Sequence, residues 1–295
     1  MVKIEFNQEL FKEHINKITP KILEAIENID SDDACLQYLK DEKEIRNLLS
    51  ANIFQLKLYI DFFEKNFPCS IEKDSDLNKL LRDIFEKEYK NWGNRTTYGA
   101  YSFVEQLALK TCPYCNRNYT FVVNEENGKL RPEIDHFYPK SIYPFLAMSF
   151  YNLIPSCSIC NHTKSDKVEK NLENPYEVKN ESYKFTYVPN SIDFSIVEKE
   201  HYDFDSFEIK IDGNPSNIEL FKLKELYKQH KDVVLELLIK KAYYPESYIQ
   251  ELSKFRFSKD EIYRYLFSNY NKDEDLHKRP LSKLIRDISD ELGLR

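Results

Sequence analysis

Two pairs of cysteines at the same short spacing constrain this chain more than any other feature. Cys112 and Cys115 form the first Cys-x-x-Cys pair, and Cys157 and Cys160 form the second. Each pair can hold one edge of a tetrahedral ion, which leaves residues 116–156 to fold as a loop over it. The spacing therefore predicts a closed, structural zinc site with four thiolate ligands.

The same cysteines are also compatible with disulfides, a redox-active Cys-x-x-Cys motif, or four ordinary buried thiols. Disulfides are typical of secreted proteins, and residues 1–6 lack the apolar segment of a secretory signal. We therefore favour zinc and expect a cytoplasmic protein. Cys35 and Cys69 have no partner at this spacing, and we interpret both as buried apolar residues.

The segment between the two cysteine pairs begins with the pattern of a β-hairpin. We expect a strand over 119–123, a turn over 126–129 and a returning strand over 130–136. The returning strand ends on Asp135 and His136. Because neighbours in a strand point to opposite faces, both side chains reach one site only if the chain bends there.

A short strand over 152–154 and a helix over 158–168 are predicted next, with Asn161 in the first turns of the helix. This order of elements between two cysteine pairs resembles the HNH, or ββα-metal, nucleases in their zinc-ribbon form. The resemblance covers roughly 112–167. Its pattern is a cysteine pair, a carboxylate followed by His, an Asn leading a short strand, and a cysteine pair followed by Asn-x-x-Lys.

The resemblance implies a role for each polar residue of the pattern. The residue matching His136 is the general base that activates water, and the one matching Asp135 holds a catalytic divalent cation. The residue matching Asn152 steadies the loop that carries the histidine. Asn161 matches the second metal ligand, but many members have histidine there, and here His162 follows. Either side chain could reach the metal, and we favour Asn161.

Phosphodiester hydrolysis needs an activated water and relief of charge on the phosphate and the leaving oxygen. Asp135 and the amide oxygen of Asn161 offer the oxygen ligands that Mg²⁺ or Mn²⁺ prefers. His136 must be neutral to accept a proton. We therefore expect activity to fall as the pH drops through its pKa, which is about 6.5 in an unperturbed histidine.

Several charged residues of the module have two interpretations. Four cations are candidates to hold phosphates, or else are surface cations: Arg117, Arg131, Lys140 and Lys164. For His162 and Lys164, we consider a contact with either the catalytic metal or a phosphate. Glu133, one strand period before Asp135, is either an accessory metal ligand or, as we favour, a surface glutamate.

The rest of the chain has the composition of a helical protein. Glycine is scarce, with 5 residues, while 21 Tyr and 20 Phe supply bulky side chains for helix packing. We expect an α+β protein, a mainly helical chain around a central zinc-stapled ββα-metal (HNH) module. Its regions are a helical N-terminal region (1–109), the nuclease module (110–170) and a mixed strand and helix C-terminal region (171–295).

Apolar periodicity places the elements of the two flanking regions. The expected N-terminal helices cover 9–28 with a break or kink at Pro20, 33–47, 52–65, 76–92 after a Ser75 cap, and 98–109. Downstream we expect strands over 183–188 and 207–211, a long helix opened by a capping box at Ser216 and Glu219, and a last helix over 280–292. In the long helix, His230 lies in the apolar stripe, so we interpret it as a core or interface residue. His14 and His201 have no partners at metal spacing.

Net charge limits how well this chain can bind nucleic acid alone. Residues 110–170 carry 8 Lys and Arg against 6 Asp and Glu, a charge of +2, while the whole chain carries −7, which leaves −9 elsewhere. DNA-binding proteins are usually basic, because neutralising phosphates drives their affinity. We therefore expect docking on a partner that binds nucleic acid, through the N-terminal helices and the apolar face Leu284, Ile288 and Leu292 of the last helix.

A basic group near that helix has two interpretations. His277, Lys278 and Arg279, with Lys283 and Arg286, contact nucleic acid or a partner, or else form a solvated helix end.

The layout of the chain and its Cys-Pro-Tyr-Cys, Asp-His and Cys-Asn motifs are similar to the HNH subunits of Septu-type anti-phage defence systems. That resemblance implies an effector nuclease that acts with an SMC-like ATPase partner. We expect no membrane association, because no apolar run has the length to span a bilayer. DNA is the favoured substrate. The alternatives are an RNA or tRNA nuclease, because such a site recognises a phosphodiester and not the sugar, and a zinc-ribbon binding module without catalysis.

Overall fold

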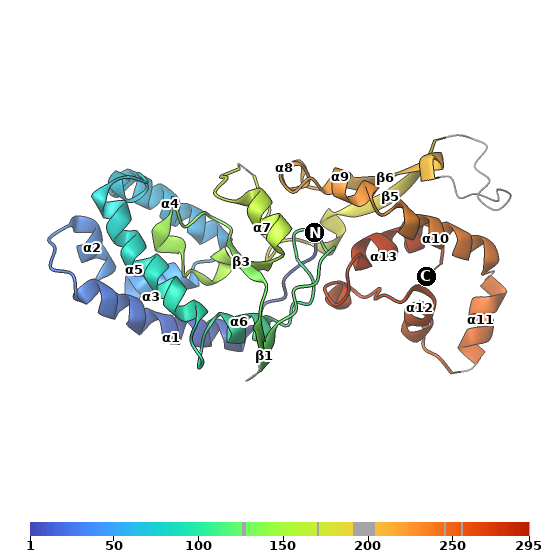
Figure 1. Ribbon diagram of the computed structural model, residues 1–295, viewed down its shortest axis with the longest axis horizontal. Helices are drawn as coiled ribbons and strands as arrows, with labels where there is room; N and C mark the ends of the chain where they lie inside the picture. Colours follow the sequence, from blue (N-terminus) through green and yellow to red (C-terminus); the bar gives the residue numbers. More distant parts are fainter. Residues whose placement is uncertain (126–127, 170, 191–203, 245, 255, 295) are drawn as a thin grey trace. The chain divides into compact units, whose positions relative to one another are not determined.

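The computed structural model describes residues 1–125, 128–169, 171–190, 204–244, 246–254 and 256–294. The chain forms two compact units (Figure 1). We call Ile4–Leu109 with Thr120–Lys170 the N-terminal unit, and Met1–Lys3, Lys110–Tyr119 and Asn171–Arg295 the C-terminal unit. The division into three functional regions stays a prediction. His201 and residues 126–127 of the expected hairpin turn lie outside the described residues.

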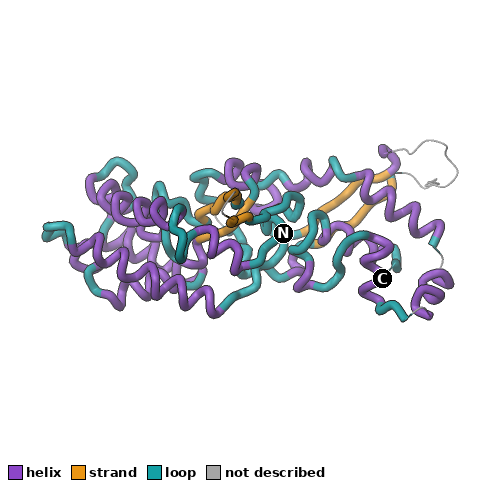
Figure 2. Tube along the Cα trace, turned by 60° about the horizontal axis from the view of Figure 1, so that its bottom comes forward, coloured by secondary structure: helices purple, strands orange, loops and turns teal. Residues whose placement is uncertain are grey.

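Helices dominate both units, and the strands form small two-stranded sheets (Figure 2). The α+β class is therefore confirmed, while a central HNH module remains a matter for proposal. Among the described residues, no helix combines the length and the apolar character needed to cross a membrane.

Six helices build the core of the N-terminal unit: α1 (Gln8–Glu27), α2 (Ala34–Leu39), α3 (Glu42–Ser50), α4 (Ile53–Asn66), α5 (Asp76–Gly93) and α6 (Ala100–Leu107). The Ser75 side chain caps α5 as predicted, by accepting a hydrogen bond from the backbone of Asn78. Of the break or kink expected at Pro20, the break is absent: α1 continues through this residue, with Ile18 and Ile22 both fully buried.

The helix expected over 33–47 is wrong as a single element. It divides into α2 and α3, because the Asp41 side chain accepts a hydrogen bond from Lys43 and caps a new helix.

Two small sheets follow the helices in the N-terminal unit. β1 (Val123–Glu125) pairs with β2 (Gly128–Leu130), and β3 (Glu133–His136) pairs with β4 (Leu153–Ser156), both antiparallel. The expected strand over 130–136 is therefore two strands. Pro132 separates them, because it has no backbone N–H for a ladder.

Two short turns of 3-10 helix, η2 (Pro144–Leu146) and η3 (Phe150–Asn152), lie between β3 and β4. The helix α7 (Ser158–Lys164) follows β4 and contacts β3. The segment from β3 to α7 is thus a strand, a loop of 3-10 turns, a second strand and a short helix.

The C-terminal unit pairs β5 (Lys184–Pro189) with β6 (Phe207–Asp212), antiparallel. Phe207, Ile209 and Ile211 are buried on one face of β6 while Glu208 and Lys210 are exposed, which confirms the predicted alternation. Six helices follow: α8 (Pro215–Leu220), α9 (Leu223–Lys228), α10 (Lys231–Tyr243), α11 (Glu246–Lys254), α12 (Lys259–Phe267) and α13 (Ser282–Glu291).

The single long helix expected after β6 is wrong. Asn214 caps α8, in place of the predicted Ser216 and Glu219 box, and Lys222 adopts a left-handed conformation that ends it. His230 then stands at the N-cap of α10, half-buried, and its Nε2 accepts a hydrogen bond from Nε of Arg117 at 2.8 Å. His230 therefore makes a polar contact within its unit, and the apolar stripe from which its core or interface role was predicted is absent.

The last helix, α13, is a core element of its unit. Leu284 and Ile288 are fully buried, so the apolar face expected to dock a partner is already covered within the chain.

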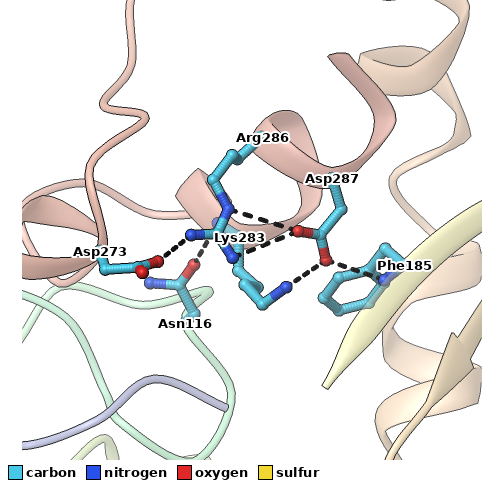
Figure 3. A network of polar contacts seen from close by, with 6 residues as sticks. All are labelled: Asn116, Phe185, Asp273, Lys283, Arg286 and Asp287. Atoms are coloured by element: carbon cyan, nitrogen blue, oxygen red, sulfur yellow. Dashed lines mark hydrogen bonds and ion pairs between the residues drawn. The ribbon is translucent and has the colours of Figure 1, made fainter. Parts of the chain in front are cut away.

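Two of the five basic residues expected near α13, Lys283 and Arg286, are buried, while Lys278 is exposed. Lys283 pairs with Asp287, and Arg286 pairs with Asp273 and Asp287 (Figure 3). The Asp287 carboxylate also accepts the backbone N–H of Phe185 at 2.9 Å, which ties α13 to β5. Lys283 and Arg286 are therefore neither a nucleic-acid contact nor a solvated helix end.

Candidate active site and zinc centre

The four cysteines of the two Cys-x-x-Cys pairs come together. Their sulfur atoms all lie within 4.8 Å of one another, and all four residues are buried. Among the described residues, no other group of three or more His, Cys, Asp or Glu side chains meets that criterion. Four thiols this close match the tetrahedral ligand set of structural zinc.

The first pair has the local geometry of a metal-binding turn. Asn116 has a φ of 50°, and its N–H donates to the carbonyl of Cys112 at 2.7 Å. The N–H of Arg117 donates to the Cys115 sulfur at 3.4 Å, a contact that favours a thiolate.

None of the six cysteines forms a disulfide. Of the two left over, Cys35 is buried as predicted, but Cys69 is exposed because it lies in a surface turn of 3-10 helix before α5.

Asp135 and His136 are both buried in β3, and β3 remains regular through both of them. Asp135 pairs in register with Ile154, and His136 with Leu153. Strand geometry directs the two side chains to opposite faces. Asp135 accordingly contacts Lys164 of α7, while His136 contacts the turn after η2 and a tyrosine of α5.

One ring nitrogen of His136 is fixed by the backbone. Nε2 lies 3.0 Å from the carbonyl oxygen of Ala147, and because that oxygen can only accept, we assign the proton to Nε2. The neutral ring then carries its lone pair on Nδ1. Burial lowers the pKa of His136 to about 3, with Lys140 and Lys164 acting in the same direction and the Ala147 bond opposing them. The ring is thus neutral far below pH 6.5.

Tyr89 of α5 borders the same histidine and was not singled out from the sequence. Its ring meets the His136 ring edge-on, with centroids 4.6 Å apart, and its hydroxyl donates to the carbonyl of Ile134 at 3.4 Å. Lys140 lies over the Tyr89 ring at 5.6 Å from its centroid. No periodicity or spacing could have revealed Tyr89, because it reaches the site from a helix distant in sequence.

Asn152 holds the loop that follows His136. Its Oδ1 accepts the N–H of Tyr138 at 2.7 Å, and its Nδ2 donates to the carbonyls of Tyr138 at 3.1 Å and Leu146 at 2.9 Å. The side chain is fully buried, and the bonds fix both backbone groups of one loop residue. This geometry suits the steadying role expected of Asn152, which stays a prediction.

Asn161 and His162 share one neighbour, Glu133. The Asn161 amide donates to Oε2 of Glu133 at 2.6 Å, and His162 Nε2 lies 3.5 Å from Oε1. Glu133 and Asp135 lie on the same face of β3 and contact Asn161 and Lys164 of α7, and carboxylate and amide oxygens are the donors that a hard divalent cation prefers. His162 is 75% exposed. The choice between Asn161 and His162 remains a prediction.

The four cations expected to hold phosphates differ in exposure. Lys164 is completely buried, and its Nζ donates to Oδ1 of Asp135 at 3.1 Å and to the carbonyl of His136 at 2.6 Å. Arg117 is held by His230. Arg131, which stacks on Tyr101, and Lys140 are half-buried. Lys140 and Arg131 are therefore the better candidates of the four.

Comparison with known proteins gives one informative similarity. The chain is 30% identical over 99 residues to the Septu protein PtuB of Bacillus thuringiensis. The matched segment is 33% of this chain and 35% of that protein, so the chain spans about a third of the length of the curated relative it matches. No family model matches the chain. No solved structure matches it either.

Proposed function

We propose that this chain is a metal-dependent nuclease of the HNH type that hydrolyses phosphodiester bonds, with DNA the favoured substrate. The observation that carries the proposal is the state of His136. It is buried, and its Nε2 is engaged by the Ala147 carbonyl, which leaves Nδ1 as the ring nitrogen that can accept a proton. A buried histidine with one ring nitrogen fixed in this way suits a general base, and the Asp135 carboxylate lies on the other face of β3.

The chain supplies the remaining groups of such a site from its own residues. Asp135 and Asn161, with Glu133 as an accessory, would hold Mg²⁺ or Mn²⁺, which when bound supplies positive charge to the phosphate. Asn152 keeps the loop after His136 in place through three hydrogen bonds. Arg131 and Lys140 would orient the phosphate. The four cysteines would hold a structural zinc ion.

We further propose that the chain acts in anti-phage defence together with an ATPase. The similarity to a Septu protein supports the defence role, and the net charge of −7 supports the need for a partner that binds nucleic acid.

The experiment that tests the nuclease proposal offers the purified chain plasmid DNA, single-stranded DNA and total RNA with Mg²⁺ or Mn²⁺. Wild type should cut DNA weakly by itself and strongly together with the protein encoded beside it. His136→Ala should abolish cutting while zinc content stays near wild type, because this residue is placed to act on water; thermal stability should fall to some extent, because the ring is buried and bonded to Ala147. Cutting of RNA alone would reassign the substrate. Unimpaired cutting by His136→Ala would contradict the assigned base.

A further inference from the structure

Lys164 differs from most lysines because its side chain is completely buried. Lysine almost always keeps its ammonium in water, since burying a charge is costly unless a partner compensates it. The relative exposure of this side chain is 0%, and that of its partner Asp135 is 3%. Lys164 is the last residue of α7, the helix that also carries Cys160 and Asn161.

Both compensating groups belong to β3. The ammonium donates to Oδ1 of Asp135 at 3.1 Å and to the backbone carbonyl of His136 at 2.6 Å. These are the neighbouring residues proposed to hold the cation and to accept the proton. The Lys164 ammonium thus connects α7 with the side chain of Asp135 and the backbone of His136.

Two simpler roles do not account for this arrangement. A phosphate on the surface cannot reach an ammonium with no exposed area. Packing alone does not require the pair either, because replacing both partners of a buried ion pair by hydrophobic side chains of similar volume is often neutral or stabilising. The charge is therefore best explained by the carboxylate that it contacts.

We propose that Lys164 is a positioning residue, which holds the Asp135 carboxylate and the His136 backbone in the arrangement needed for cation binding and proton transfer. The inference rests on the proposed nuclease function. Hydrogen bonds to a metal-binding carboxylate fix its orientation, and their loss typically weakens metal binding or activity by about 10- to 100-fold. Because α7 carries Asn161 as well, Lys164 also keeps the two proposed ligand-bearing elements together.

The test measures Mn²⁺ binding to the full, zinc-loaded chain by isothermal titration calorimetry, alongside cleavage rates. Lys164→Met should weaken Mn²⁺ binding by about 10- to 100-fold. Its cleavage rate should stay low at saturating Mn²⁺, because the His136 backbone is no longer held. Zinc content should remain close to wild type, while thermal stability should fall, because the buried Asp135 carboxylate loses its cationic partner. The matched control is Lys167→Met, which makes the same substitution at an exposed position three residues further on. It should change neither the Mn²⁺ affinity nor the cleavage rate.

Each outcome decides the proposal. Wild-type Mn²⁺ binding and cleavage in Lys164→Met would overturn it. If that variant fails to fold, Lys164→Gln, which keeps a hydrogen-bond donor without the charge, carries the same expectation. Failure of both to fold would assign Lys164 to structure alone and also overturn the proposal. A wild-type chain that neither binds Mn²⁺ nor cuts would instead contradict the nuclease function itself.

Discussion

Two histidines of the N-terminal unit hydrogen-bond to consecutive carbonyls of one turn. His136 contacts the carbonyl of Ala147, and His14 of α1 contacts that of Met148 at 2.7 Å. The second ring nitrogen of His14 accepts the Tyr98 hydroxyl at 2.8 Å, so both its nitrogens are satisfied in the neutral form. His14, which has no partner at metal spacing in the sequence, thus fixes the turn that orients the proposed base.

This arrangement predicts a loss of stability in acid. Burial lowers the pKa of His14 to about 4, against the opposing effect of its bond to Met148. Since the unfolded state binds the proton from about pH 6.5 downward, stability present above pH 6.5 is lost as the pH falls towards 4. Protonation of His14 in the unfolded state should therefore lower the free energy of unfolding by about 2 kcal/mol as the pH falls from 7 to 5.

Denaturant unfolding at both pH values measures this loss in wild type and in His14→Gln, which keeps a donor for the Met148 carbonyl. The difference between the two proteins isolates His14 from effects common to both, such as zinc release. Equal losses in the two proteins would show that His14 does not titrate as its burial requires.

A second prediction at this scale concerns the metal ligands. Asn161→Ala should lower the cleavage rate more than His162→Ala, by roughly tenfold or more, because Asn161 is half-buried against Glu133 while His162 is mostly exposed. Cleavage measured across a Mn²⁺ titration checks this. The reverse order would assign the ligand to His162.

At the scale of elements, the zinc turn and α7 depend on the four cysteines. Structural zinc contributes about 10 kcal/mol or more in small metal-clamped folds. Cys112→Ser or Cys160→Ser should therefore lose the zinc ion and the folded state around it, as followed by metal analysis and circular dichroism. Cys69→Ser, at an exposed cysteine outside the cluster, should behave like wild type. Folded, fresh protein without zinc would refute the four-thiolate site.

Because one face of α13 is buried, substitutions on that face should reduce stability; the sequence alone suggests that they would disrupt docking. Leu284→Ala should destabilise the C-terminal unit by about 2 to 5 kcal/mol, because it empties a fully buried position between packed elements. Leu292→Ala, at a half-buried position one residue beyond α13, should cost clearly less. Thermal unfolding compares the two variants. If both substitutions lowered stability by a similar, small amount, α13 would instead be interpreted as a free docking surface.

At the scale of the whole molecule, charge governs substrate binding. The chain carries −7, and two of its four candidate phosphate ligands, Lys164 and Arg117, are engaged within the protein. The purified chain should bind DNA at or below the weak non-specific range, with a Kd of about 10⁻⁴ to 10⁻⁶ M at physiological salt. A bound partner that holds DNA would raise the local substrate concentration without new contacts from this chain.

Fluorescence anisotropy with labelled duplex DNA at two salt concentrations, with and without the protein encoded beside this chain, measures that affinity. We expect weak binding and weak cutting alone, and strong cutting in the complex. Tight, salt-tolerant binding by the chain alone would contradict the dependence on a partner.

Features that depend on spacing along the chain could be predicted from the order of residues. The two Cys-x-x-Cys pairs predicted the thiol cluster, Ser75 predicted the start of α5, and the alternation over 207–211 predicted the buried face of β6. These signals are local, because a cap, a metal-binding turn and a strand face each need only a few neighbouring residues.

The tertiary structure alone decided which residues surround Asp135 and His136. Tyr89, Ala147 and Lys164 reach them from α5, the turn after η2 and the end of α7. It also decided that Lys164 is an internal partner of a carboxylate and that α13 is core. Burial and pairing of a charge depend on segments that are distant in sequence. The local sequence around Lys164, or the apolar stripe of α13, therefore cannot reveal them.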